Sequence, residues 1–205
     1  MTALLDLGRP PAARLPEGSA VLPPPQRPDV QRELVARVDA ARPTWARLAR
    51  LQLSEQEIGR GRHVDHANAN VLRRILGEHG WPDVPLVGHD GSTAAFRLAL
   101  HADTQPDVQR SANRLMYAAV QRSTASFQQW ARLHDRCLLN SGVPQLFGTQ
   151  CQLGPDGPER QPVRDPGSLD ARRADAGLPP ADEALHAFRL RLAADPPTIN
   201  LAELE

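Results

Sequence analysis

The chain has 205 residues and carries 24 basic and 24 acidic side chains, so its formal net charge is zero. This balance argues against a nucleic-acid-binding protein, because affinity for a phosphate backbone requires a net basic surface. No apolar run reaches the ~18 residues that indicate a membrane-spanning helix, and residues 1–28 lack the pattern of a secretory signal. We therefore expect a cytoplasmic protein of one domain with tails that binds neither nucleic acid nor a membrane.

Two features of residue usage bear on compartment and partners. Every side chain counted as basic is an arginine, which we attribute first to the codon usage of a GC-rich genome and second to phosphate recognition. The two cysteines, Cys137 and Cys151, are too few for a disulfide framework. We expect both to be free thiols in a reducing compartment.

The N-terminal part of the chain begins with a proline-rich segment. Residues 1–28 favour polyproline II over helix and predict an extended or disordered arm. Asp29 is a suitable cap for a helix that runs to about Ala41. Pro43 should interrupt it, and a second helical stretch is expected over residues 44–53.

The middle of the chain predicts four helices. The segment EIGRGRH at 57–63 breaks the apolar pattern before the first of them, and residues 81–91 predict a loop with two prolines. Ser92 is a suitable N-cap, and Pro106 suits a first helical turn. The four helices are expected at residues 65–80, 92–103, 106–121 and 126–142.

The C-terminal third predicts a hairpin followed by two helices. Strand-like segments at 146–153 and 160–165 flank the turn sequence GPDGP, and Pro162 indicates an edge strand. Short helices are then expected at residues 168–177 and 180–194.

These elements predict an α+β fold that is mostly α. We expect a single bundle-like helical domain over residues 29–195, with one small antiparallel β-hairpin at about 145–165. Residues 1–28 form the arm, and residues 196–205 form a tail.

Four predicted helices carry polar side chains on the apolar stripe that should face the core. They are Asp65 and Asn68 on the first helix, His101 on the second, Gln109 on the third and Asp135 on the fourth. Burying a polar group without a partner costs about 1–3 kcal/mol. These groups must therefore meet one another, water or a ligand.

The first interpretation is a pocket for a small polar molecule, with acid–base catalysis. His101 is then the proton-exchanging group, because its ordinary pKa lies near neutrality. Asp103 or Asp135 orients it, and we assign the catalytic partner role to Asp135. The sequence does not separate a lyase, an isomerase, a cyclase and a hydrolase, and no cofactor motif is found. The predicted substrate-binding side chains are Asp65, Asn68, Gln109, Arg136, Gln145, Thr149 and Gln150.

The alternative interpretation is that these groups satisfy one another. Asp65 then caps its own helix, Gln109 completes a helix end, Asp135 and Arg136 form surface ion pairs, and His101 interacts with a helix dipole. The protein would then be a non-catalytic ligand-binding or protein-interaction module. A homodimer is left open.

A metal site is a third option, which we do not favour. His63, Asp65 and His66 lie close in sequence, and further candidates are His89, Asp90 and His101. The spacing H-x-x-H is loose, and no closing ligand set at zinc spacing appears. The chain has no P-loop, and GHDGS at 88–92 is not the G-x-S-x-G elbow of a hydrolase.

Several short motifs together resemble an uncharacterised bacterial family, the domain of unknown function numbered six-six-two-four. The resemblance covers about residues 60–180 and implies no established reaction. The family pattern usually has Tyr where Phe147 stands and often Glu where His89 stands. The resemblance supports the pocket residues and rests on D-x-x-N at 65–68, GWP at 80–82, VG at 87–88, HAD at 101–103, Gln109, L-x-DR at 133–136, Q-x-FGTQ at 145–150 and LDARR…GLPP at 169–180.

Overall fold

The computed structural model describes residues 23–154 and 157–194. Of the predicted arm, residues 1–22 lie outside the described residues, and so does the predicted tail at 196–205. The α+β, mostly α fold with a small hairpin is confirmed. The elements of the described residues are α1 (Pro28–Leu48), α2 (Glu55–His79), α3 (Val84–Leu100), α4 (Pro106–Gln121), α5 (Phe127–Asn140), β1 (Cys151–Gly154), β2 (Gly157–Arg160), η1 (Pro166–Ser168), α6 (Leu169–Asp175) and α7 (Ala181–Ala193).

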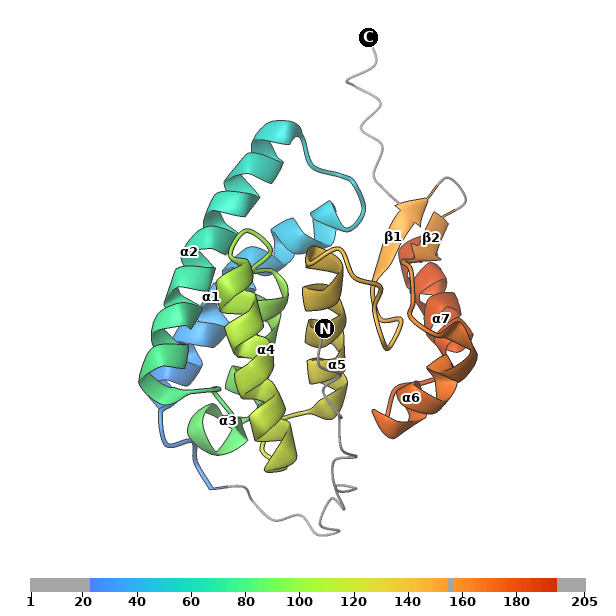
Figure 1. The fold of residues 1–205 in the computed structure, drawn as a ribbon. Helices are drawn as coiled ribbons and strands as arrows, with labels where there is room; N and C mark the ends of the chain where they lie inside the picture. Colours follow the sequence, from blue (N-terminus) through green and yellow to red (C-terminus); the bar gives the residue numbers. More distant parts are fainter. Residues whose placement is uncertain (1–22, 155–156, 195–205) are drawn as a thin grey trace.

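The helices α1 to α5 form a bundle, and the hairpin with α6 and α7 lies beside α5 (Figure 1). Each helix of the bundle contributes large side chains that are shielded from solvent, which together form one core. No helix of the described residues has the length and apolar character needed to cross a membrane. Representative core side chains, one from each helix, are Leu34, Leu72, Leu98, Met116 and Trp130.

The predicted interruption at Pro43 is wrong, because α1 continues through it to Leu48. Proline inside a helix removes one backbone hydrogen bond and costs about 3 kcal/mol. The apolar stripe of α1, which includes Val38 and Ala41, is buried and packs mainly against α3. Beyond Pro43 the partly buried Trp45 packs against the same core. This burial before and after the proline outweighs its local cost.

The helix α2 begins ten residues earlier than predicted, so residues 57–63 are helical. Its start is a capping box, in which the Ser54 hydroxyl accepts from the backbone N–H of Glu57 at 3.3 Å and the Glu57 carboxylate accepts from the backbone N–H of Ser54 at 2.9 Å. Asp65 therefore lies inside α2 and does not cap it. Gly61 has a packing role, because a Cβ there would lie 3.0 Å from Cγ2 of Thr44 on α1.

The helix α3 also begins earlier than predicted, at Val84, with the Asp83 side chain as its cap. It has a break at Gly88, whose backbone has φ 69° and ψ 175°. Ser92 is buried within the helix and is not its N-cap. One of the two prolines of the predicted loop lies in the first turn of α3. A backbone N–H at that position would have no acceptor within the helix, so proline is tolerated there.

The predicted hairpin forms, but its second strand is displaced. The strands pair antiparallel with Cys151 opposite Arg160, and β2 ends where the predicted strand begins. Further along, Gln145 and Val163 form one isolated parallel bridge. This bridge ties the segment before β1 to the segment after β2.

The conformation at Gly88 leads to a stability prediction with opposite signs at two glycines. Gly88→Ala should lower the free energy of unfolding by about 1–3 kcal/mol, because that backbone region is accessible almost only to glycine. Gly77→Ala on the exposed side of α2 should raise it by about 0.5–1 kcal/mol, since a Cβ there meets nothing within 4 Å. Urea unfolding of both variants checks this, and equal effects of the two substitutions would contradict it.

Candidate functional site

Asp135 holds the polar segment that joins α5 to β1. Its side chain has 0% exposure. One oxygen accepts from the backbone N–H groups of Leu146 at 2.8 Å and Phe147 at 3.0 Å. The other accepts from the N–H and the hydroxyl of Thr149, both at 2.9 Å. Both oxygens are occupied by this segment, and Asp135 does not line the cavity that contains His101. This geometry does not support the predicted role of Asp135 as the catalytic partner of His101.

Gln145 supports the same segment from within. It too has 0% exposure, and its amide nitrogen donates to the carbonyls of Gln150 at 3.0 Å and Gln161 at 2.8 Å. Its amide oxygen accepts from the backbone N–H of Gln150 at 2.9 Å. This side chain is enclosed, and its hydrogen bonds take the place of backbone pairing at the base of the hairpin. This geometry does not support the predicted substrate-binding role of Gln145.

Asp103 is the centre of a second network, at the end of α3. Arg136 donates to both of its oxygens through Nε and Nη2. Gln109 of α4 and Asn140 of α5 donate their side-chain amides to the same carboxylate, at 3.2 and 2.8 Å. Gln109 is 1% exposed and also donates to the carbonyl of Ala99. Its amide fixes the end of α3 between α4 and α5, and this geometry does not support its predicted contact with substrate.

Asn68 lies apart from the other predicted residues. It is 4% exposed, and its side-chain oxygen accepts from Arg37 of α1 at 3.2 Å. Its amide nitrogen has no partner among the described residues. Asn68 lines neither of the two larger cavities, so its predicted role in substrate binding is not supported.

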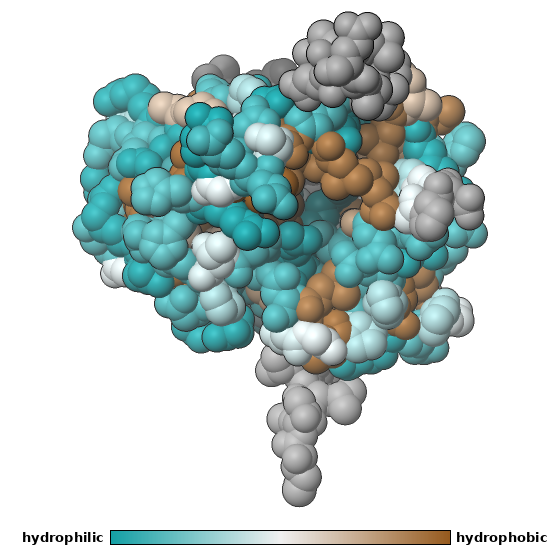
Figure 2. All heavy atoms as spheres, turned by 90° about the horizontal axis from the view of Figure 1, so that it is seen from above, coloured by the Kyte–Doolittle hydropathy of each residue, from teal (hydrophilic) through white to brown (hydrophobic). Residues whose placement is uncertain are grey.

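A cavity of about 520 Å³, which we call the His101 hollow, lies between the last turns of α1 and the first turns of α2. That end of the bundle is uppermost in Figure 1. Figure 2 views the molecule from this end and shows a hollowed face with hydrophilic residues inside it and hydrophobic residues at its side. Of the predicted site residues, it brings together Asp65, His101 and Arg136. The polar and aromatic side chains of its lining are Thr44, Trp45, Arg62, Asp65, His101, Asp103, Thr104 and Arg136.

Trp45 joins the two titratable side chains of the His101 hollow. Its ring stacks on the imidazole of His101 with centroids 3.9 Å apart and planes 2° from parallel. Its indole N–H donates to a carboxylate oxygen of Asp65 at 2.9 Å. Within the described residues, the ring nitrogens of His101 take part in no hydrogen bond. Sequence reasoning missed Trp45, because aromatic residues on an apolar stripe usually belong to the core and Pro43 appeared to separate it from α1.

The environment of this hollow shifts the pKa of His101, Asp65 and Asp103. Burial lowers the pKa of His101 to about 4; the charge of Asp103 opposes this shift, and the charges of Arg136 and Arg97 reinforce it. Burial raises the pKa of Asp65, although the Trp45 hydrogen bond opposes it. Burial acts to raise the pKa of Asp103, but the hydrogen bonds and charge of Arg136, together with the hydrogen bonds from Asn140 and Gln109, outweigh burial and lower it. At neutral pH the imidazole is therefore uncharged beside a charged Asp103–Arg136 pair.

A second cavity of about 550 Å³, which we call the arginine hollow, lies between α5, the 148–151 segment and α7. It contains Thr149 and Gln150, so these predicted residues do not face His101. Gln150 donates to the carbonyl of Arg132 at 3.2 Å, and the hydroxyl of Thr149 is bonded to Asp135. The predicted single pocket is thus divided into two cavities, both of which include Ala49 in their walls.

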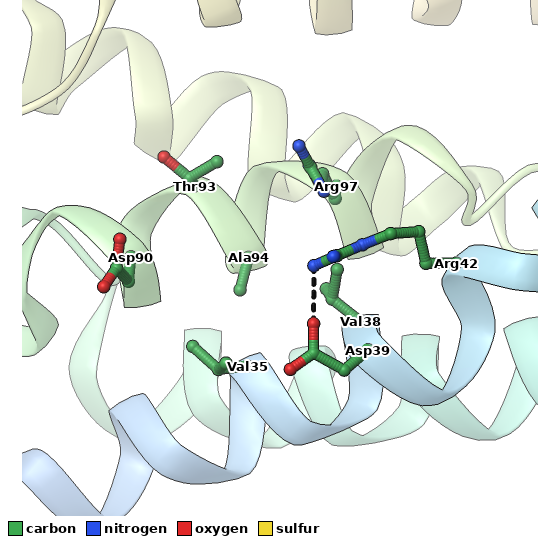
Figure 3. A pocket seen from close by; sticks show the side chains of 8 residues that line it. All are labelled: Val35, Val38, Asp39, Arg42, Asp90, Thr93, Ala94 and Arg97. Carbon is green, nitrogen blue, oxygen red and sulfur yellow. Dashed lines mark hydrogen bonds and ion pairs between the residues drawn. The ribbon is translucent and has the colours of Figure 1, made fainter.

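A smaller cavity of about 210 Å³ lies between α1 and α3 (Figure 3). Val35, Val38 and Ala94 point into it, and an Asp39–Arg42 ion pair of 2.5 Å crosses one side. It contains none of the predicted site residues and no histidine or cysteine. We assign it no role.

The histidines considered for a metal site are dispersed. His63, His66 and His89 are exposed. Across residues 23–154 and 157–194, no three His, Cys, Asp or Glu side chains come together as a metal ion would require.

Comparison with known proteins identifies a family but no activity. A model described as a family of unknown function (DUF6624) matches residues 28–194. The chain belongs to this family. No curated protein and no solved structure matches the chain. In this DUF6624 member, three of the motifs quoted above, at 101–103, 133–136 and 145–150, supply the Asp103 and Asp135 networks.

The lowered pKa of His101 predicts how stability depends on pH. Between the ordinary pKa of 6.5 and the folded value of about 4, the unfolded chain binds more protons than the folded chain. Stability therefore falls as the pH falls through this window. His101→Gln takes up no proton, so it should lose less stability than the original chain when the pH falls from about 7 to about 5. Urea unfolding at the two pH values measures this, with His89→Gln as an exposed control. Equal losses for His101→Gln and the original chain would contradict a neutral His101.

The four hydrogen bonds at Asp135 predict a large cost for a small substitution. Asp135→Asn removes the charge and replaces one acceptor oxygen by an NH₂ group that faces N–H donors. We expect a loss of about 3 kcal/mol in the free energy of unfolding. Asp90→Asn is the matched control, since Asp90 is exposed and has no hydrogen bond or ion pair in the described part of the chain, and it should change stability by less than about 0.5 kcal/mol. A similar small effect at Asp135 would show that the segment does not depend on it.

Proposed function

We propose that the His101 hollow binds a small polar molecule and exchanges a proton with it. The observation that carries this proposal is the imidazole of His101, which faces the hollow with no hydrogen bond to any described residue. Unused polar groups are uncommon in partly buried positions. A ligand with a polar edge would satisfy the ring nitrogens that the protein leaves open.

The proposed chemistry uses two groups in different protonation states. His101 is uncharged at neutral pH, so its free nitrogen accepts a proton from the bound molecule without first losing one. The raised pKa of Asp65 brings that carboxyl closer to the range in which it carries and returns a proton. Trp45 holds both groups, through ring stacking with His101 and a hydrogen bond to Asp65. Arg136, fixed by Asp103, provides positive charge at the wall.

The second candidate is a non-catalytic ligand-binding or protein-interaction module. One observation favours it. A pKa of about 4 makes His101 a weak base, and proton transfer is most efficient when the pKa of the base lies near the working pH. In this case His101 acts only as a hydrogen-bonding group in the wall of the hollow.

A thermal-shift screen of small polar metabolites against the full chain tests the proposal. A compound that binds the native state raises the melting temperature by mass action. We expect hits that stabilise the original chain and the exposed control His89→Gln, but that stabilise Asp65→Asn less. NMR of each hit with the protein then shows whether it is converted. Conversion that falls about 100-fold or more in His101→Gln, with binding retained, is the result expected of an acid–base group.

The outcomes separate the two candidates. Binding without conversion by the original chain favours the module. Hits that stabilise the original chain, Asp65→Asn and His101→Gln by the same amount would show that the His101 hollow is not where the ligand binds, and both candidates would fail.

A further inference from the structure

The arginine hollow has a strongly one-sided charge in a protein whose net charge is zero. Its walls contain four arginines and not one Asp or Glu among the described residues. The arginines come from separate parts of the fold, namely α5, β2, α6 and α7. The fold therefore brings together four arginines that are far apart in the sequence. The four residues are Arg132, Arg160, Arg173 and Arg191.

Arg173 is a buried cation without an ion pair. It is 2% exposed, and it donates through Nε to the carbonyl of Pro179 at 2.6 Å and through Nη1 to the carbonyl of Phe147 at 2.6 Å. Its Nη2 donates to no acceptor of the described residues. The carboxylates of Asp170 and Asp135 act on it only from a distance. Buried arginines are rare unless paired with an opposite charge, so the position is incomplete without an anion nearby.

Arg132 and Arg191 are exposed at the hollow, and neither forms a hydrogen bond or an ion pair with any described residue. Arg191 lies over the ring of Phe188, 5.9 Å from its centroid. Arg160 has one ion pair, to Asp182 at 2.9 Å, whose side chain is 97% exposed. The surrounding protein partly desolvates the guanidinium of Arg132 and lowers its pKa, and the positive charge of Arg191 adds to this shift. The like charges thus act on one another across the hollow with no anion between them.

Part of the lining of the arginine hollow is apolar. It is formed by Leu100 at the end of α3, Leu178 before α7, and Leu185 and Phe188 on α7. A simple inorganic anion would contact the arginines and leave this surface in water. A ligand that contacts both the arginines and these apolar side chains needs a charged group and an apolar body.

We propose that the arginine hollow is a binding site for a phosphate monoester with an apolar body. A monoester carries almost two negative charges at pH 7, which matches three arginines without an ion pair better than the single charge of a carboxylate does. Planar guanidinium groups bind phosphate oxygens through paired hydrogen bonds. The proposal is independent of catalysis at His101, because it rests on other residues and another cavity.

Isothermal titration calorimetry with phenyl phosphate as the probe tests the proposal on the full chain. We expect binding that weakens as salt is added. Arg132→Gln and Arg191→Gln should each weaken it about tenfold, since each removes one charge-assisted contact. Both side chains are exposed and unbonded, so the variants should fold, which circular dichroism verifies. Arg114→Gln is the matched control, because Arg114 is equally exposed and unbonded but lies outside the hollow.

Further titrations identify the chemistry of the ligand and separate this proposal from that for the His101 hollow. Benzoate and inorganic phosphate should bind more weakly than phenyl phosphate, and His101→Gln should bind phenyl phosphate as the original chain does. The proposal is overturned if phenyl phosphate does not bind, if Arg132→Gln and Arg114→Gln bind it equally well, or if benzoate binds more tightly.

Discussion

A buried carboxylate must be surrounded by hydrogen-bond donors, and Asp135 meets this requirement with the backbone of residues 146–149. The consequences extend through the C-terminal half. Once Asp135 fixes this segment to α5, the carbonyls of Phe147 and Gly148 point at Arg173 and accept from it. Arg173 in turn donates to the carbonyl of Pro179, two residues before the start of α7. One charged side chain of the bundle therefore positions the wall of the arginine hollow.

The parts of the fold that could be predicted are those with local signals. Pro106 and Ser126 mark helix starts in the sequence, and α4 and α5 begin there. The errors arose where tertiary packing overrides a local preference. Pro43 and Gly61 are both unfavourable inside helices, yet α1 and α2 continue through them because the two helices pack closely there. The capping box at Ser54 was a readable signal for the start of α2, and it outweighs the two glycines that follow it.

The site was predictable in its residue types but not in its pairings. Helical spacing correctly indicated that Gln109 and Asp135 face inward, since both are almost fully buried. It gives no information on how far one helix is shifted along another, and this shift decides which groups meet. Asp103, two residues after His101 and beyond the end of α3, accepts from Arg136 and Gln109. Asp135, on the stripe, accepts only from the segment at 146–149, through three backbone N–H groups and the Thr149 hydroxyl. The prediction of one pocket failed because the backbone amides of 146–149 are as good a partner for a carboxylate as any side chain.

Two histidines in this fold show how structural and available groups differ. His134 and His101 each stack on a tryptophan, with centroids 4.8 and 3.9 Å apart, and burial lowers the pKa of both. His134 has a hydrogen-bond partner in Asn113 and lines none of the three cavities. His101 has no such partner and faces a cavity that also holds Asp65. Stacking and burial alone therefore do not distinguish a functional imidazole. The distinguishing feature is an unused ring nitrogen beside a space large enough for a ligand, and of these two histidines only His101 combines both.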